Sequence, residues 1–243
     1  MPEYDVSRYG ECWADAYDEF YAGRADQDAC VEFLRDAAGT GAALELGIGT
    51  GRVGVPLAAR GVAVAGIEAS PSMIAKLREK PGGEDIAVHQ GDFGSFSLGR
   101  KFSLVYVVFN TIFYLAGQDE QVSCFESVAE HLGDGGVFVV EAIVPGLGSS
   151  VQVADVDLDR CTLYVPERDA VTQRVVAQFV RFSIDGRVQL LPDVKRYAWP
   201  SELDLMARIA GLVRTRRWGG WRREPFTASS IKHVSVYQAR ERG

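Results

Sequence analysis

The segment ALELGIGTGR, residues 43–52, places three glycines at every second position directly after an apolar run. The apolar run predicts a short buried strand. Glycines after such a strand permit a tight turn and let a ligand touch the backbone with no Cβ in the way. In open parallel sheets ligands bind beyond the carboxyl ends of the strands, so we expect a binding loop formed by Glu45, Gly47, Gly49 and Gly51.

The spacing of these glycines distinguishes two classes of ligand. Dinucleotide-binding loops follow the pattern G-x-G-x-x-G. This loop reads G-x-G-x-G, with Arg52 where the third glycine would stand. The carboxylate of Glu45 would also repel a pyrophosphate. The pattern therefore disfavours an NAD-dependent oxidoreductase and favours a ligand that carries a positive ammonium or sulfonium near Glu45.

The surrounding chain predicts an α/β fold. Strand-like and helix-like segments alternate with short connections from about residue 42 to 144, which is typical of a parallel sheet with helices on both faces. Within this region, Ser70 and Pro71 are typical of the start of a helix. After Pro145 the apolar residues alternate with a period of two, which indicates about four antiparallel strands. A helix over 201–211 and two final strands follow.

Acidic residues end the second and third predicted strands. Glu68 could accept two hydrogen bonds from a ribose diol. Asp92 could accept from an adenine amino group, with Phe93 supplying an amide or a ring face, and Met73 could pack on the adenine. The expected cofactor contacts in this part of the chain are Glu68, Ala69, Met73, Gly91, Asp92 and Phe93.

These motifs together resemble the class I S-adenosylmethionine-dependent methyltransferases. The resemblance rests on E-x-G-x-G-x-G, the acid that ends the second strand, ASPSMIAKLR, QGDF and LGDGGVFVVE, in this order. It implies a doubly wound, Rossmann-like, seven-stranded and mostly parallel sheet that binds S-adenosylmethionine and releases S-adenosylhomocysteine. The stretch that begins HQGDFGSFSLG further resembles small actinobacterial enzymes that N-methylate amino sugars in antibiotic pathways, and those enzymes also carry an antiparallel insert.

The resemblance also implies a division of the chain. Residues 1–40 would form a helical lid, and 41–148 with 198–243 would form the Rossmann-like domain that binds the cofactor. Residues 149–197 would form an antiparallel β cap over the acceptor.

An aromatic stripe marks the expected lid. Tyr9, Trp13, Tyr17 and Tyr21 recur at every fourth residue, which places them on one face of a helix. Simple packing of that helix on the domain would also explain the stripe. By the resemblance, Tyr17 and Tyr21 reach the methionine end of the cofactor or the acceptor. Arg24 would then pair with the methionine carboxylate; alternatively it is a charge at a helix end.

The acceptor is expected near the end of the fourth strand. Phe109, Asn110 and Tyr114 follow this strand, and the resemblance places Tyr114 near the acceptor amine. Phe109 and Asn110 are also expected to contact the cofactor. His233 begins the last strand, near the face that bears the insert. The candidate catalytic residues are therefore Tyr17, Tyr114 and His233. No cluster with metal-ligand spacing is visible in the sequence, so we expect a metal-independent reaction.

Bulk properties restrict the partners and the location. The net charge of −7 argues against a nucleic-acid or anionic-membrane surface, and the chain has no apolar run of about 18 residues. The four cysteines form no C-x-x-C pair, which is typical of reduced thiols in the cytoplasm. We expect a small-molecule acceptor, with a homodimer as one assembly to test.

The sequence therefore predicts transfer of a methyl group to a small molecule in secondary metabolism. An amine of an amino sugar or a related compound is favoured over a hydroxyl. A non-catalytic regulator that binds the adenosyl ligand stays open. Nucleic-acid methylation is disfavoured, because VFNT stands where an N/D-P-P-Y/F tetrad would follow the fourth strand.

Overall fold

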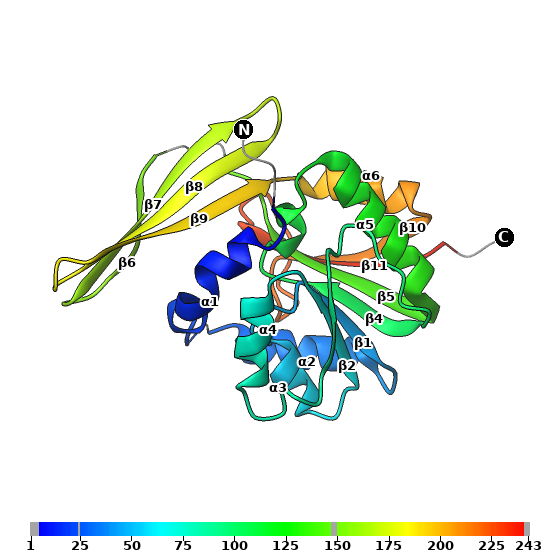
Figure 1. Cartoon of the computed structure of the whole chain (residues 1–243). Helices are drawn as coiled ribbons and strands as arrows, with labels where there is room; N and C mark the ends of the chain where they lie inside the picture. Colours follow the sequence, from blue (N-terminus) through cyan, green and yellow to red (C-terminus); the bar gives the residue numbers. More distant parts are fainter. Residues whose placement is uncertain (1–4, 24, 147–149, 241–243) are drawn as a thin grey trace.

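The computed structural model describes residues 5–23, 25–146 and 150–240. Its main sheet has seven strands in the order β10-β11-β5-β4-β1-β2-β3 (Figure 1). Five neighbouring strands are parallel, whereas β11 runs antiparallel to β5 and β10 antiparallel to β11. The predicted doubly wound, mostly parallel sheet is confirmed. The strands are β1 Ala43–Leu46, β2 Val64–Glu68, β3 Ala87–Gln90, β4 Phe102–Val107, β5 Leu132–Ile143, β10 Leu212–Trp218 and β11 Lys232–Ala239.

Helices cover both faces of this sheet. Helix α2 packs Val31 and Leu34 on one face, where Leu104 of β4 also points. On the other face, Phe125 of α5 packs against Phe138 of β5, with ring centroids 5.1 Å apart. These apolar contacts exclude water from both sides of the sheet and fix its position between the helices. The helices are α1 Arg8–Phe20, α2 Gln27–Ala38, α3 Gly54–Ala58, α4 Pro71–Arg78, α5 Gln118–His131 and α6 Pro200–Ile209, with a 3₁₀ turn η1 at Thr111–Tyr114.

The start of α4 shows how the sequence sets a local element. The Oγ of Ser70 accepts a hydrogen bond from the backbone N–H of Met73 at 3.1 Å, and Pro71 is the first helical residue. This cap satisfies one of the N–H groups that a helix leaves free at its start. It places α4 directly after β2, at the carboxyl edge of the sheet, as the sequence predicts.

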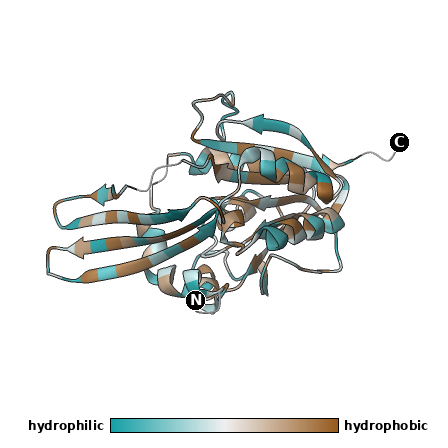
Figure 2. Ribbon diagram, turned by 90° about the horizontal axis from the view of Figure 1, so that it is seen from above, coloured by the Kyte–Doolittle hydropathy of each residue, from teal (hydrophilic) through white to brown (hydrophobic). Residues whose placement is uncertain are grey.

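The insert forms a second sheet of four antiparallel strands in the order β6-β7-β8-β9. Its strands are β6 Gln152–Val156, β7 Arg160–Asp169, β8 Arg174–Ser183 and β9 Val188–Arg196. It projects from the main sheet, as Figures 1 and 2 show. Helix α1 packs against it, because Phe179 of β8 contacts Trp13 and Phe20 edge to face at 5.3 Å. The Nε1 of Trp13 also donates to the backbone oxygen of Pro192 at 2.9 Å.

In the described part of the chain, no helix combines the length and the apolar character needed to cross a membrane.

Candidate active site

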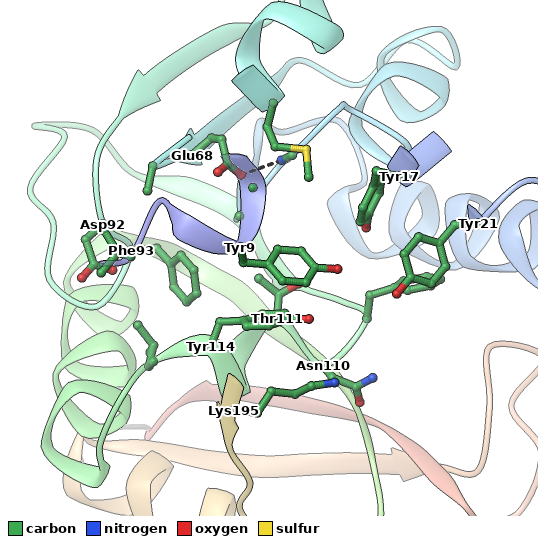
Figure 3. A pocket seen from close by; sticks show the side chains of 18 residues that line it. Tyr9, Tyr17, Tyr21, Glu68, Asp92, Phe93, Asn110, Thr111, Tyr114 and Lys195 are labelled. Atoms are coloured by element: carbon green, nitrogen blue, oxygen red, sulfur yellow. Dashed lines mark hydrogen bonds between the residues drawn. The ribbon is translucent and has the colours of Figure 1, made fainter. Parts of the chain in front are cut away.

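A cavity opens at the carboxyl ends of β1, β2 and β4, between the main sheet, α1 and the insert (Figure 3). Its empty space is about 930 Å³, part of it open to solvent. The residues that line it are Val6, Tyr9, Gly10, Tyr17, Tyr21, Gly47, Gly49, Glu68, Ala69, Met73, Asp92, Phe93, Phe109, Asn110, Thr111, Tyr114, Leu115 and Lys195.

The glycine loop supplies bare backbone to this cavity. Gly49 has a φ of +56°, which is a left-handed conformation that glycine adopts easily. A Cβ added there would meet nothing within 4 Å, so a side chain would occupy open space in the cavity wall. At Gly47, with a φ of +67°, an added Cβ would lie only 2.5 Å from Cγ2 of Thr111. Both positions therefore require glycine, for different reasons.

The carboxylate of Glu68 organises the loops on either side of it. Its two oxygens accept hydrogen bonds from the backbone N–H of Gly49 at 2.8 Å and of Ser70 at 2.9 Å. Burial raises the pKa of Glu68, and these two N–H donors oppose that rise. A carboxylate has about four acceptor sites, so Glu68 retains capacity to accept from a ligand diol.

The far end of the cavity joins apolar and acidic groups. Met73 is buried, and Phe93 lies beside Gly47. The Oδ1 of Asp92 accepts from the N–H of Gly94 at 2.8 Å, which fixes the carboxylate at the rim. This combination suits a flat, apolar base with an exocyclic amino group.

Helix α1 closes the cavity from above and is held by its acidic residues. The carboxylate of Glu11 accepts from Ser70 Oγ and Ser72 Oγ at 2.6 Å each, and from the N–H of Ser72 at 3.1 Å. Two turns further, Asp18 accepts from Thr50 Oγ1 at 2.6 Å. Because these bonds tie α1 to α4 and to the glycine loop, three tyrosines of the aromatic stripe line the cavity: Tyr9, Tyr17 and Tyr21.

A strained turn faces the cavity after β4. Phe109 and Asn110 have φ values of +61° and +63°, and two consecutive left-handed residues other than glycine are costly. The structure holds them in place. The N–H of Phe109 donates to Glu141 Oε2 at 2.7 Å, and the guanidinium of Arg52 lies 3.4 Å from the centre of the Phe109 ring. Asn110 Oδ1 accepts from the N–H of Ile143 at 2.6 Å.

Glu45 is not among the described residues that line the cavity, whereas the sequence analysis expects it in the binding loop beside the ligand. The side chain points beneath the loop, where it is 3% exposed and accepts from the Tyr106 hydroxyl at 2.9 Å. Burial raises the pKa of Glu45 to about 8. Side chains alternate between the two faces of the sheet along β1, and Glu45 lies on the same face as its neighbour Tyr106 of β4. Glu45 therefore supports the loop from behind.

The structure does not bring His233 to the cavity, where the sequence analysis expects it to be catalytic. His233 is the second residue of β11 and is fully buried, with Nδ1 2.9 Å from Ser235 Oγ. Burial lowers its pKa to about 3, so it stays neutral. It is not among the described residues that line the cavity. His131 is structural, because its Nε2 accepts from the N–H of Leu98 at 2.8 Å.

Two further predicted contacts lie elsewhere. A Cβ on Gly51 would press on Val55 and Leu77, so this glycine serves helix packing behind the loop. The N–H of Gly91 donates to the backbone oxygen of Glu68 at 2.9 Å, which aligns β3 rather than lining the cavity. Arg24 lies outside the described residues.

The cavity also contains residues that the sequence analysis did not assign to the site. Tyr9 was visible in the aromatic stripe, but nothing set it apart from Trp13, which is buried in the α1 interface. Lys195 of β9 and Thr111 of η1 carry no local signal at all. The remaining cavity residues of this kind are Val6, Gly10 and Leu115.

Comparison with known proteins agrees with this arrangement. Residues 43–136 match the family model of a methyltransferase domain. The solved structure of the CcbJ methyltransferase from Streptomyces caelestis superposes with a TM-score of 0.92 and is 38% identical, over 97% of this chain and 99% of that one.

The chain belongs to the S-adenosylmethionine-dependent methyltransferases. The cypemycin N-terminal methyltransferase of a Streptomyces species is 29% identical to it, over 96% of this chain and 98% of that enzyme. A dTDP-3-amino-3,4,6-trideoxy-α-D-glucopyranose N,N-dimethyltransferase of Streptomyces venezuelae is 36% identical over 53% of this chain and 56% of that enzyme. The predicted family, the enzyme class and the cofactor are thereby confirmed.

The residues present fit the cofactor. The open space at Gly49 lies beside the Glu68 carboxylate, as a ribose diol requires, and Met73, Asp92 and Phe93 form a wall suited to adenine. The methionine end would then point to Tyr17, Tyr21 and the turn at Phe109. Three or more clustered side chains able to hold a metal ion are not found among the described residues.

Proposed function

We propose that this methyltransferase N-methylates an amine of a small natural product, with an amino sugar or a similar compound as the favoured acceptor. One observation carries the proposal: a relative matched along nearly its whole length is named as an N-terminal methyltransferase, and another as an amino-sugar N,N-dimethyltransferase. The polar groups of the cavity support it, because hydroxyls of four tyrosines and the Lys195 ammonium surround a space suited to a polar acceptor.

The chain contributes mainly positioning to this reaction. Bound S-adenosylmethionine supplies an electrophilic methyl group on a sulfonium. Glu68 and Asp92 would hold the adenosyl part, and Tyr17 and Tyr114, which line the same cavity, would flank the acceptor. Fixing two reactants in one geometry removes a large entropic cost, and this effect alone can supply much of the rate.

O-methylation of a hydroxyl and ligand binding without turnover are the competing functions. The first experiment is calorimetric titration with S-adenosylmethionine, S-adenosylhomocysteine and NAD. Micromolar binding of both adenosyl ligands without NAD is the expected result. Mass spectrometry then follows methyl transfer to a panel of dTDP-amino sugars and peptides with a free amino terminus, each paired with its hydroxyl analogue. Turnover of the hydroxyl compounds alone would contradict the proposal, and binding with no turnover of either set would favour a regulator.

The proposal includes a homodimer formed through the outer face of the insert. Val153, Leu163, Val180 and Leu190 stand opposite one another across the four strands and share this face. Val153 and Leu190 are 64% and 60% exposed, and Phe182 and Val188 on the same face are also exposed. An exposed face on which several large apolar side chains gather is typical of an interaction surface. A second copy of the chain offers the matching apolar face, as a two-fold interface requires.

A cytoplasmic location is part of the same proposal. Cys12, Cys30, Cys124 and Cys161 are all free thiols, and Cys30 and Cys124 are buried. Free thiols persist most readily in a reducing compartment.

A further inference from the structure

A buried carboxylate of the insert contacts the cavity wall at the acceptor end. Asp193 of β9 is 1% exposed. Its Oδ1 accepts a hydrogen bond from the hydroxyl of Tyr114 at 2.9 Å, and its Oδ2 lies 2.8 Å from the ammonium of Lys195. Burial of a carboxylate is costly unless it is paired. The hydroxyl and the ammonium compensate that cost and hold Asp193 directly behind the cavity.

Tyr114 carries this connection into the cavity, because its side chain lines the cavity wall. Its ring packs beside that of Tyr9, with ring centroids 4.3 Å apart. Tyr114 donates its one hydroxyl proton to Asp193, so the oxygen can still accept a proton from the cavity side. Figure 3 shows Tyr114 between Tyr9 and Lys195. The Tyr114 hydroxyl therefore connects the cavity to Asp193.

The carboxylates within the cavity wall are committed elsewhere. Among the described lining residues they are Glu68 and Asp92. Glu68 accepts from the N–H groups of Gly49 and Ser70, and Asp92 from that of Gly94, at the end that suits the adenosyl group. A proton released at the acceptor end therefore meets the hydroxyls of Tyr9 and Tyr114 first.

These tyrosines are poor final proton acceptors. Burial raises the pKa of both Tyr9 and Tyr114 well above 10, so neither is a phenolate at neutral pH. A neutral hydroxyl can, however, take up one proton while it passes another on. The group that can keep the proton is the Asp193 carboxylate, which accepts from Tyr114.

We propose that Asp193 accepts the proton that the acceptor amine must lose, relayed through the hydroxyl of Tyr114. This inference rests on the proposed amine methylation. An N–H bond of the protonated amine breaks, and the proton goes to the Tyr114 oxygen. Tyr114 passes its own proton to Oδ1 of Asp193. The neutral amine keeps a free lone pair, and Asp193 becomes a neutral acid beside Lys195.

Lys195 gives the relay a way to reset. Its ammonium lies 2.8 Å from Oδ2 of Asp193 and its side chain is 18% exposed, so it connects the Asp193 site with solvent. The titratable and charged groups that face Asp193 come from three other elements and from its own strand: Tyr9 of α1, Tyr114 of η1, Tyr164 of β7 and Lys195 of β9.

The experiment compares pH profiles of kcat/KM for wild type, Asp193→Asn and Tyr114→Phe, with the amine that wild type methylates fastest in the panel. General bases contribute about 10²–10⁴-fold. We expect each variant to lose about 100-fold at pH 7, and the loss to shrink to about 5-fold or less at pH 10, where the amine is already neutral in solution. Glu167→Gln removes an exposed carboxylate of β7 and should follow the wild-type profile at every pH.

Two controls separate the relay from other causes. Titration with S-adenosylhomocysteine should give an unchanged Kd for Asp193→Asn, which shows that the cavity is intact. A variant that loses the same factor at pH 7 and pH 10, or loses nothing, overturns the relay while amine methylation stands. If wild type methylates no amine, the proposed function fails, and the relay fails with it.

Discussion

At the scale of single residues, the site depends on a few positions whose backbone or charge state has no substitute. The glycines at 47 and 49 adopt left-handed φ values beside a buried carboxylate, Glu68, that bonds to the loop itself. Glu45, which opens the same motif, is turned away and acts as a buried support. Neighbours in one short motif thus have different physical roles.

Gly49→Val should abolish binding of S-adenosylhomocysteine, because its side chain would fill the open space beside Glu68. Gly99 is the matched control, since it has a φ of +64° and equally open surroundings on an exposed loop. Gly99→Val should show the same backbone strain and normal binding. Calorimetry measures both. Micromolar binding by Gly49→Val would mean that the ligand lies elsewhere.

Glu68→Ala should weaken S-adenosylhomocysteine binding by about 1–3 kcal/mol, the range for unpairing a buried hydrogen-bonded group. The substitution removes both the diol acceptor and the acceptor for the N–H of Gly49. Glu84→Ala, at an exposed position, serves as the control. An unchanged Kd for Glu68→Ala would exclude its role as the ribose ligand.

Glu45 makes stability depend on pH in a direction opposite to that of most acids. Its folded pKa is about 8, against about 4.5 in the unfolded chain, so the folded state holds a proton that the unfolded state releases. Its contribution is therefore complete below about pH 4.5 and is lost as pH rises to about 8. Urea unfolding at pH 5.5 and 8 should show that Glu45→Gln removes this loss, since glutamine stays neutral. An identical pH dependence in the variant would contradict the assignment.

At the scale of elements, α1 and the start of α4 approach so closely that their contact requires a glycine. An added Cβ on Gly10 would lie 2.3 Å from Cβ of Ser70. Glu11 then bonds to Ser70 and Ser72 across the same contact. The roof of the cavity is thus a helix held by short-range polar contacts at one point of close approach.

Gly10→Ala should displace α1 and weaken S-adenosylhomocysteine binding at least tenfold, although alanine favours a helix. Hydrogen exchange of the α1 amides should rise in parallel. Cys12→Ala, at an exposed position of the same helix, should change neither quantity. Normal exchange and affinity in Gly10→Ala would show that the close contact is not needed to close the cavity.

At the scale of the whole molecule, the insert has two different faces. The inner face carries Phe179, Asp193 and Lys195 towards α1 and the cavity. The outer face is apolar and exposed at Phe182 and Leu190. One antiparallel sheet thereby serves the site on one side and, in our proposal, a second copy on the other.

Leu190→Arg should convert the proposed dimer to a monomer, because it places a charge in the middle of the apolar face. Light scattering after gel filtration measures the mass of each species. Val171→Arg makes the same exchange in the β7–β8 turn, where Val171 is 93% exposed, and should leave the dimer intact. A monomeric wild-type chain would contradict the dimer without affecting the site.

The sequence by itself determined the fold class, the family and most of the residues at the end of the cavity that we assign to the adenosyl group. The glycine loop, Glu68 and Asp92 each follow directly from a strand of the parallel sheet, so local order along the chain places them together. Only the tertiary structure decided the acceptor end. Asp193 lies 79 residues from its partner Tyr114, and no local periodicity connects them. The same holds for Glu45 and His233, because the direction of their side chains depends on which strands and helices pack around them.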